Sequence, residues 1–416
     1  MVGRIYHPNG ILKGAIPLIT SKSISNRVLI IQALCKEKFH IKGLSQAKDT
    51  RVLASLLKER PVLWDVGPAG TSYRFLTAYL AFQPGEQILT GSERMKKRPI
   101  KPLVDTLTAI GARIEYMGEE GYPPLRIKTQ GINRTNMVEV SAGTSSQFIS
   151  ALLLIAPSLP NGLVIRLRGD VVSPSYIEMT LGILRYFGVE TNWNNESIVV
   201  KPAPYRGKAF QVEADWSAAS YYYALVALAD EASLVLEGLN NNSLQGDAVI
   251  ADLMEPLGVQ TEFSSGRVIL QKQQRYQTEF KHEFLSCPDI VQTIAVICAG
   301  LGIPGTFSGV QTLSIKETNR LSALHNELKK VQCSFLPLNG EDPNIAGQIY
   351  GLTGAACWSK PPRFATYDDH RMAMSFAPLA LKGDIEIESP VVVEKSYPSF
   401  WDHLESLGFG VEITGD

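Results

Sequence analysis

Six segments of the chain are apolar on every side and rich in small residues. They cover residues 27–35, 74–82, 148–156, 221–229, 293–299 and 372–381. A helix without a polar face has to be buried, so the pattern predicts six buried helices. Their first residues are separated by 47, 74, 73, 72 and 79 positions. A spacing this regular is typical of an internal repeat.

Further elements recur around these helices. A strand-like segment follows each of them, at residues 39–44, 87–90, 163–167, 233–237, 305–308 and 384–388. An amphipathic helix comes next in five copies, at residues 101–110, 176–187, 247–257, 319–331 and 400–407. Gly111, Gly188 and Gly258 end three of these helices and precede alternating apolar and polar residues, which is typical of a helix C-cap followed by a strand. The pattern predicts a βαβαββ unit repeated six times, degraded near residues 58–65 and with Gln332 replacing one glycine.

The length of the chain predicts two domains, because 416 residues exceed what one ordinary hydrophobic core accommodates. Six repeats then give an α/β fold with three units per domain, in which sheets surround the buried helices. We expect a first domain of residues 20–213 and a second of residues 214–416. Residues 1–19 are expected to join the second domain, because chain termini often pack across such a division.

Composition and charge exclude several classes of protein. The formal net charge is −1 and no long basic run occurs, which argues against a nucleic-acid surface. The five cysteines are odd in number and lack CxxC spacing, so we expect reduced thiols in a cytoplasm. The N-terminus lacks the pattern of a signal peptide, and no apolar run is long enough to cross a bilayer. The sequence therefore predicts a cytoplasmic protein.

Polar clusters stand at the starts of the six predicted buried helices. They are SKSISNR (21–27), GPAGTSYR (67–74), GTSSQF (143–148), ADWSAAS (214–220), SCPDIVQT (286–293) and TYDDHR (366–371). Helix capping alone also accounts for the Ser, Thr and Asp residues. It does not account for the charged or titratable Lys22, Arg27, Arg74, Asp289, His370 and Arg371. Because helix N-termini attract anions, we expect one electropositive cleft between the domains for a polyanionic substrate.

Other cations lie on loops marked by glycine or proline. Arg98 precedes a proline and is held extended, which favours a role in ligand binding, whereas Lys96 and Lys97 are typical of a solvated face. There is no Walker A motif, and the GxGxxG match at residues 300–305 follows a helix instead of opening one. The histidines lack metal-binding spacing, and no GxSxG or HExxH motif occurs. A reaction on phosphorylated or carboxylated substrates that needs no cofactor and no metal is therefore expected.

Ten motifs in order along the chain resemble the enolpyruvyl transferase family. They are SKSISNR, AGTSYR, ERMKKRPI, TSSQF, GDVVSPSY, ADWSAAS, CPDIVQT, IKETNRL, DDHRMAM and EKSYP, and they extend from Lys22 to Pro398. The resemblance implies an inside-out α/β barrel of two domains, with the first residues of the chain in the second domain. This agrees with the fold expected from the repeats.

The resemblance also implies an activity. The shikimate branch of the family transfers the enolpyruvyl group of phosphoenolpyruvate to the 5-hydroxyl of shikimate 3-phosphate and releases phosphate, in aromatic amino-acid biosynthesis. The other branch acts on UDP-N-acetylglucosamine, typically with Lys-Asn near its start and a reactive cysteine in the loop before the arginine. Here Ser23 follows Lys22 and residues 91–99 contain no cysteine, which favours the shikimate branch. An RNA-end-processing protein of related fold is a more distant alternative. A monomer is expected.

The family's functional residues map onto this chain. For shikimate 3-phosphate they are Lys22, Ser23, Arg27, Ser145, Ser146, Gln147, Ser173, Tyr176, Asp289, Thr312 and Lys316. For phosphoenolpyruvate they are Lys22, Gly70, Arg98, Gln147, Arg320, His370, Arg371 and Lys395. The resemblance implies that Asp289 and Glu317 are acid–base carboxylates, with Asp289 taking the 5-hydroxyl proton. Lys22 is a third titratable group expected to take part in proton transfer, and keeping Gly70 implies sensitivity to the inhibitor glyphosate. Four residues depart from the family pattern, namely Pro68, Pro174, Thr312 and Asn319.

Overall fold

The computed structural model describes residues 1–416 except 129–134, 144, 195, 339–347 and 416. The chain divides into two compact units, each of which has its own hydrophobic core. Unit 1 consists of Met1–Thr20 and Glu213–Asp416, and unit 2 of Ser21–Val212.

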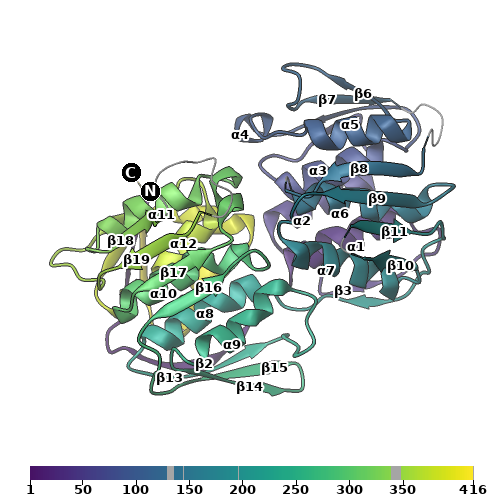
Figure 1. The fold of residues 1–416 in the computed structure, drawn as a ribbon. Coiled ribbons are helices and arrows are strands. Elements are labelled where there is room, and N and C mark those ends of the chain that lie inside the picture. The colour runs from purple at the N-terminus through teal and green to yellow at the C-terminus, as the bar shows by residue number, and fades with distance from the viewer. Residues whose placement is uncertain (129–134, 144, 195, 339–347, 416) are drawn as a thin grey trace. The chain divides into compact units, whose positions relative to one another are not determined.

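Unit 2 is built around three buried helices that pack against one another (Figure 1). These are α1 (Lys22–Leu34), α3 (Gly70–Leu80) and α6 (Ser146–Ile155). Two four-stranded sheets lie around them, in the orders β4 (Leu63–Asp65), β5 (Glu86–Thr90), β7 (Leu125–Lys128), β6 (Arg113–Tyr116) and β10 (Thr191–Trp193), β11 (Ser197–Val200), β9 (Leu163–Arg168), β8 (Met137–Ser141). A third sheet pairs β12 (Phe210–Gln211) with β3 (Ile41–Lys42). The remaining helices are α2 (Lys48–Glu59), α4 (Glu93–Lys96), α5 (Lys101–Ile110), α7 (Pro174–Tyr186) and the 3-10 turn η1 (Ala156–Ser158).

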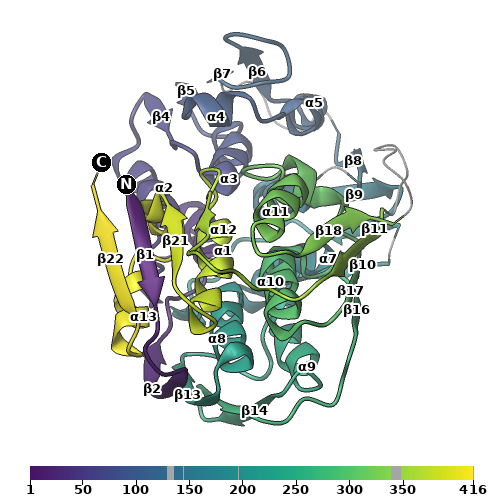
Figure 2. The same ribbon diagram turned by 90° about the vertical axis from the view of Figure 1, so that its left-hand side faces the viewer.

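Unit 1 repeats this plan with three central helices inside three four-stranded sheets (Figure 2). The central helices are α8 (Trp216–Leu228), α10 (Val291–Leu301) and α12 (His370–Phe376). The sheets have the orders β14 (Val259–Ser264), β15 (Arg267–Lys272), β13 (Glu231–Glu237), β2 (Ile11–Pro17); β16 (Phe280–Glu283), β17 (Gly305–Ser308), β19 (Tyr350–Thr353), β18 (Ser334–Pro337); and β20 (Arg363–Phe364), β21 (Ile385–Glu388), β1 (Val2–Tyr6), β22 (Gly410–Thr414). The other helices are α9 (Ile250–Met254), α11 (Arg320–Lys329), α13 (Phe400–Ser406) and the 3-10 segments η2 (Gly246–Val249), η3 (Pro288–Ile290), η4 (Gln311–Ile315), η5 (Ala377–Leu381) and η6 (Pro390–Lys395).

Every four-stranded sheet follows the same rule of strand direction. One edge pair is parallel and the other two pairs are antiparallel, as in β2–β13–β15–β14. A parallel pair needs a crossover connection, and the buried helix of each repeat supplies it in the sheets where both strands follow in sequence. The N-terminal strands complete sheets of unit 1, because β2 pairs with β13 and β1 lies between β21 and β22. The repeated α/β architecture expected from the sequence is confirmed.

The first repeat departs from the predicted βαβαββ unit, since its sheet has two strands in the part of the chain that the structure describes. Its second helix, α2, was not recognised in the sequence because no glycine ends it. Arg60 adopts the left-handed conformation there instead, with φ of 50°.

The six buried helices begin earlier than the sequence pattern predicts. The first starts at Lys22 instead of residue 27, and the fourth at Trp216 instead of residue 221. Their first turns contain polar residues that are buried or half-buried, which an apolar pattern cannot reveal. The segments 372–381 and 247–257 are each split between an α-helix and a 3-10 turn. In the first of these Pro378, which lacks a backbone N–H, lies in the 3-10 turn that follows the helix.

Candidate active site

The start of α1 places a lysine beside a buried carboxylate. The side chain of Ser21 caps the helix by accepting a hydrogen bond from the backbone N–H of Ile24 at 3.4 Å. Lys22 is the first helical residue, and its Nζ lies 3.1 Å from Oδ2 of Asp49. Asp49 is buried in the first turn of α2. The ion pair therefore fixes the ammonium group of Lys22 at the N-terminus of α1.

Arg27 is a buried cation held by uncharged oxygens. Its guanidinium donates at 2.8–3.2 Å to the hydroxyls of Thr180 and Ser150 and to the backbone carbonyls of Ser23 and Tyr176. Burial lowers the pKa of Arg27 to about 10, so the side chain stays charged at neutral pH. It is the sixth residue of α1, so the prediction that it stands at the helix start is wrong. Arg27 lies instead in the second turn of α1. Its positive charge there adds to the positive end of the helix dipole.

Gly70 opens α3 and faces two arginines. A Cβ built on Gly70 would collide with Nη1 of Arg98 and would lie 2.8 Å from Nη1 of Arg74. Both guanidinium groups therefore rest against bare backbone. Arg74 donates to the carbonyl of Gly70 at 2.9 Å from the second turn of α3, so it too lies inside its helix and not at the start. The Nε of Arg98 is buried without a hydrogen-bond partner among the described residues.

The starts of α6 and α7 supply polar side chains. Ser145 caps α6 by accepting from the backbone N–H of Gln147 at 3.3 Å, and Ser146 is buried as the first helical residue. The amide nitrogen of Gln147 donates to Thr71 on α3 at 3.2 Å, which links two of the predicted helix starts. Ser173 precedes α7 in the left-handed conformation, with φ of 54°.

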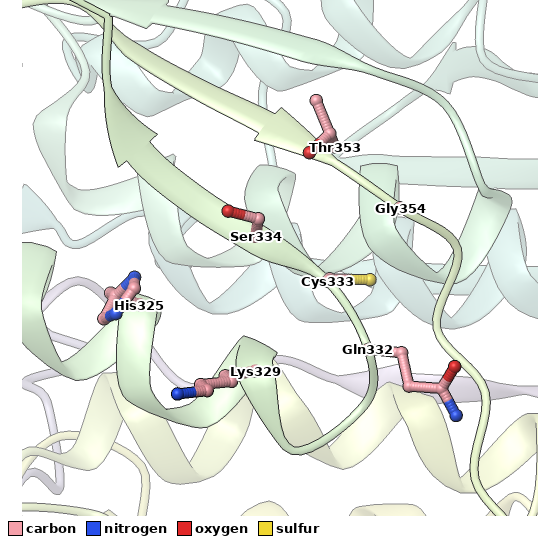
Figure 3. Close-up of a pocket in the computed structure, with 7 residues that line it drawn as sticks. All are labelled: His325, Lys329, Gln332, Cys333, Ser334, Thr353 and Gly354. Carbon is pink, nitrogen blue, oxygen red and sulfur yellow. The ribbon is translucent and has the colours of Figure 1, made fainter.

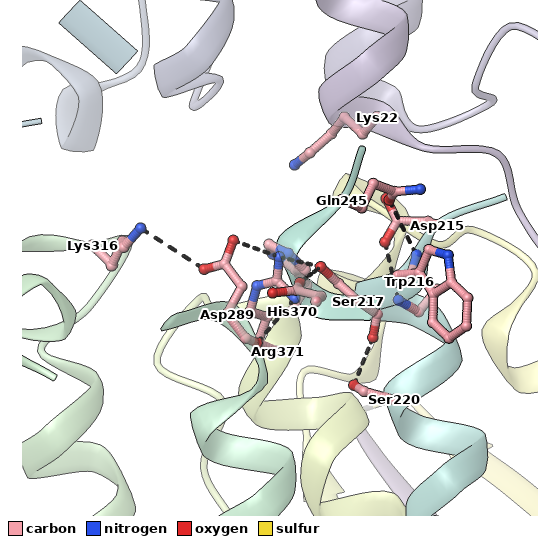
Figure 4. Close-up of polar contacts among 12 residues, drawn as sticks. Lys22, Asp215, Trp216, Ser217, Ser220, Gln245, Asp289, Lys316, His370 and Arg371 are labelled. Atoms are coloured by element: carbon pink, nitrogen blue, oxygen red, sulfur yellow. Dashed lines mark hydrogen bonds and ion pairs between the residues drawn. The ribbon is translucent and has the colours of Figure 1, made fainter. Parts of the chain in front are cut away.

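In unit 1, Asp289 lies among three cations, and Figure 4 shows two of them, Lys316 and Arg371. Its Oδ1 is 3.0 Å from Nη1 of Arg320 and 3.8 Å from Nζ of Lys316, and its Oδ2 is 3.0 Å from Nη2 of Arg371. Asp289 belongs to the turn η3 ahead of α10, whereas Arg371 is the second residue of α12. Burial lowers the pKa of Lys316, although the nearby charge of Asp289 opposes this. The cluster orients both oxygens of the carboxylate.

Arg320 is the centre of this cluster. It is the first residue of α11 and 2% exposed, and it donates to Asp369 at 2.7 Å and to Asp289 and Glu317 at 3.0 Å each. Burial by itself would lower the pKa of Arg320, but these three carboxylates outweigh it and raise the pKa. A buried cation with three carboxylates is a rigid framework, since each of its donors is aimed at a fixed acceptor.

Three more predicted residues lie in unit 1. Lys395 pairs with Glu317 at 3.2 Å, so the proposed proton-transfer carboxylate is held from two sides. His370 is buried at the first position of α12, with Nδ1 3.8 Å from Asp369. Thr312 is buried on η4, and its hydroxyl has no hydrogen-bond partner among the described residues.

The structure places Lys22, Gly70 and Ser146 at helix starts in unit 2 and His370 and Arg371 at the start of α12 in unit 1, and it adds carboxylates that the sequence analysis missed. These are Asp49, Asp247 and Asp369. Asp369 stands in the DDHR motif, so its position next to His370 was the one available signal. Asp49 and Asp247 lie in segments without a recognised motif, and only packing shows that they are buried near the predicted cations.

Comparison with known proteins identifies the family. A sequence model of EPSP synthase (3-phosphoshikimate 1-carboxyvinyltransferase) matches residues 57–404. The chain belongs to the EPSP synthase family. A 3-phosphoshikimate 1-carboxyvinyltransferase of Bacteroides fragilis is 43% identical over 97% of both chains. One of a Sulfurovum species is 34% identical, over 95% of this chain and 97% of the other.

Solved structures of the family share the fold. A structure of EPSP synthase from Acinetobacter baumannii superposes with a TM-score of 0.78 and covers 99% of this chain and 100% of its own. Its sequence identity is 20%, so this likeness concerns the fold. The inside-out α/β arrangement expected from the resemblance is thereby supported.

Two departures from the family pattern have a clear structural role here. Asn319 caps α11, because its side chain accepts a hydrogen bond from the backbone N–H of Ser322 at 3.2 Å. An asparagine caps a helix as well as an aspartate does. Pro174 is the first residue of α7, the helical position that tolerates proline best because its N–H would have no partner. Both substitutions are therefore compatible with the local fold of an EPSP synthase.

No helix in the described part of the chain is long and apolar enough to cross a membrane. Among the same residues no group of three or more His, Cys, Asp or Glu side chains is arranged to hold a metal ion.

A pocket of about 350 Å³ lies away from these residues, at the C-terminal end of α11 beside β18 and β19 (Figure 3). Its lining consists of His325, Lys329, Gln332, Cys333, Ser334, Thr353 and Gly354. None of the residues that the family resemblance implicates lines it. The pocket therefore has no part in the candidate active site.

Proposed function

We propose that the chain transfers the enolpyruvyl group of phosphoenolpyruvate to the 5-hydroxyl of shikimate 3-phosphate and releases phosphate, as a step of aromatic amino-acid biosynthesis. The observation that carries the proposal is the 43% identity, over 97% of the chain, to a relative named for this activity. The cation–carboxylate cluster around Asp289 supports it, because the reaction joins two anionic substrates and moves protons.

The substrates together bring two phosphates and two carboxylates, which repel one another. A pair of unit charges at 4 Å interacts by about 4 kcal/mol at an effective dielectric near 20, so several cations are needed. We assign phosphoenolpyruvate to Gly70, Arg98, Arg320, His370, Arg371 and Lys395, with Lys22 and Gln147 reaching both ligands. We assign shikimate 3-phosphate to Lys22, Ser23, Arg27, Ser145, Ser146, Gln147, Ser173, Tyr176, Asp289, Thr312 and Lys316.

The chemistry has two steps. In the first, the 5-hydroxyl oxygen bonds to C2 of phosphoenolpyruvate while the hydroxyl loses its proton and C3 gains one. In the second, C3 loses a proton as the C2–phosphate bond breaks. We propose Asp289 as the group that takes the hydroxyl proton, and Lys22 and Glu317 as the other proton-transfer groups. Lys316, Arg320 and Arg371 support this role of Asp289, because they fix the direction of its oxygens.

The decisive experiment measures phosphate release from phosphoenolpyruvate with each of two acceptors. We expect release with shikimate 3-phosphate and none with UDP-N-acetylglucosamine. Release with the sugar nucleotide alone would assign the chain to the other branch of enolpyruvyl transferases.

Glyphosate is expected to inhibit the reaction, because Gly70 is retained. Sedimentation of the active protein would test the expectation of a monomer.

Gly70→Ala is expected to raise the KM for phosphoenolpyruvate and to weaken inhibition by glyphosate. The added methyl group would push the guanidinium of Arg98 out of its place, whereas the helix start itself accepts alanine. Displacing a substrate-positioning group by about 1 Å costs on the order of 100-fold in rate. Steady-state kinetics would measure the effect, with Gly118→Ala as the control because a Cβ there is in ordinary contact distance, 4.0 Å from Pro124. Unchanged kinetics of Gly70→Ala would remove Arg98 from the site.

A further inference from the structure

A buried carboxylate that the family resemblance assigns to neither substrate lies near Arg371. Asp247 is on the turn η2 and is 5% exposed. Gln245, two residues before Asp247, connects this turn to the start of α8. Its side-chain amide donates a hydrogen bond to the carbonyl of Ala214 at 2.8 Å and accepts one from the backbone N–H of Trp216 at 3.1 Å. The position of Asp247 is therefore set by the fold and not by a flexible loop.

A single hydroxyl connects Asp247 to Arg371. Ser217, the second residue of α8, donates a hydrogen bond to Oδ2 of Asp247 and accepts one from Nη2 of Arg371 at 3.4 Å. The same Nη2 lies 3.0 Å from Oδ2 of Asp289 (Figure 4). The guanidinium of Arg371 therefore interacts with two carboxylates, with Asp289 directly and with Asp247 through the hydroxyl of Ser217.

The cations of this half of the site are already paired with carboxylates. Within the described residues of unit 1, Lys316, Arg320, Arg371 and Lys395 lie among the carboxylates Asp247, Asp289, Glu317 and Asp369, and Asp215 adds a further negative charge near Asp247. An anionic substrate that takes the positive charge of Arg371 leaves an excess of negative charge in a buried place. A buried carboxylate in that situation binds a proton.

We propose that Asp247 is a positioning residue of the reaction: through Ser217 it orients Arg371, and it takes up a proton when an anionic substrate binds to that arginine. The proposal rests on the function proposed above. No group other than a solvent proton is consumed, and no bond of the substrate changes in this step.

The surroundings of Asp247 support such an uptake near neutral pH. The pKa of Asp247 is raised to about 7, because burial and the negative charge of Asp289 together outweigh the opposing effects of Arg371 and the Ser217 hydroxyl. Asp215 at the N-cap of α8 adds a smaller repulsion. The nearby Cys287 adds none, because burial raises the pKa of its thiol and keeps it neutral.

The pH dependence of substrate affinity tests the proposal. The full-length wild type, Asp247→Asn and Asp252→Asn are compared by the KM for phosphoenolpyruvate between pH 6 and 9, at saturating shikimate 3-phosphate. Above about pH 7 the wild-type KM should rise by up to about tenfold per pH unit, because the ionised Asp247 then competes with the substrate for Arg371. Asp247→Asn mimics the protonated form, so its KM should stay low in this range. Asp252 is exposed on the adjacent α9, so Asp252→Asn should follow the wild type.

Ser217→Ala separates orientation from charge, since it removes the connecting hydroxyl and keeps Asp247. We expect its KM to be about tenfold higher at pH 6, close to the lower end of what one lost hydrogen bond to a charged group contributes. A KM equal to that of the wild type would exclude orientation of Arg371 through Ser217. An Asp247→Asn variant whose KM rises with pH as the wild type does would exclude proton uptake at Asp247, because the phosphate of the substrate titrates identically in both.

Failure of the proposed function would look different. The wild type and Asp252→Asn would then release no phosphate with shikimate 3-phosphate. Proton uptake can still be measured by calorimetric titration of phosphoenolpyruvate alone, in two buffers of different ionisation enthalpy. Equal uptake by the wild type and Asp247→Asn would overturn the proposal about Asp247. The midpoint of unfolding shows whether Asp247→Asn is correctly folded. Because the raised pKa of Asp247 makes the wild type lose stability as the pH rises toward 7, Asp247→Asn should be at least as stable as the wild type at pH 8.

Discussion

Arg320→Ala is expected to lower the free energy of unfolding by about 3–5 kcal/mol. The substitution removes a 2% exposed cation and leaves Asp369, Asp289 and Glu317 close together without it. The largest part of the loss comes from Asp369, because its side chain is wholly buried and its negative charge would have lost its cation. Equilibrium unfolding in urea would measure the change. Arg363→Ala is the matched control: it breaks an exposed pair with Glu386, and such pairs contribute about 0–1 kcal/mol.

The same variant should lose activity even at temperatures where it stays folded, because Arg320 fixes both Asp289 and Glu317. Arg320→Lys keeps the charge but cannot donate to three carboxylates in one plane, so we expect intermediate stability and low activity. A stable and active Arg320→Ala would contradict both the electrostatic account of the cluster and the assignment of Arg320 to phosphoenolpyruvate.

Asp289→Asn is expected to lower kcat by on the order of 10²–10⁴-fold, the usual contribution of a general base. The amide has the same shape but takes no proton from the 5-hydroxyl. Removing one negative charge also frees Arg371 and Arg320 to interact with an anionic substrate. The KM for phosphoenolpyruvate should therefore stay constant or fall while kcat collapses. Steady-state kinetics with both substrates varied would measure the two quantities separately.

A matched control for this variant is Asp384→Asn, which changes an aspartate paired with Arg4 at the surface. It should leave kcat unchanged. If Asp289→Asn instead kept kcat and raised the KM for shikimate 3-phosphate, Asp289 would be a binding residue only. Glu317 and Lys22 would then be the remaining candidates for the base.

The sequence by itself determined the repeated α/β architecture of this protein. Each central helix is apolar on all sides and each outer helix on one side, and these periods depend only on neighbouring residues. The prediction located all six central helices but placed their starts up to five residues late, as at Lys22 and Trp216. Polar residues in a first turn do not show whether they are exposed or buried.

Only the tertiary structure decided how these residues are paired. Lys22 meets Asp49 across 27 residues, and Arg320 meets Asp369 across 49. No local period links such positions, because packing of separate helices sets the distance between them. The same holds for Gly70, whose missing side chain leaves room for Arg98. Asp247 is the clearest case, since burial beside Ser217 and Arg371 gives an otherwise ordinary aspartate its altered proton affinity.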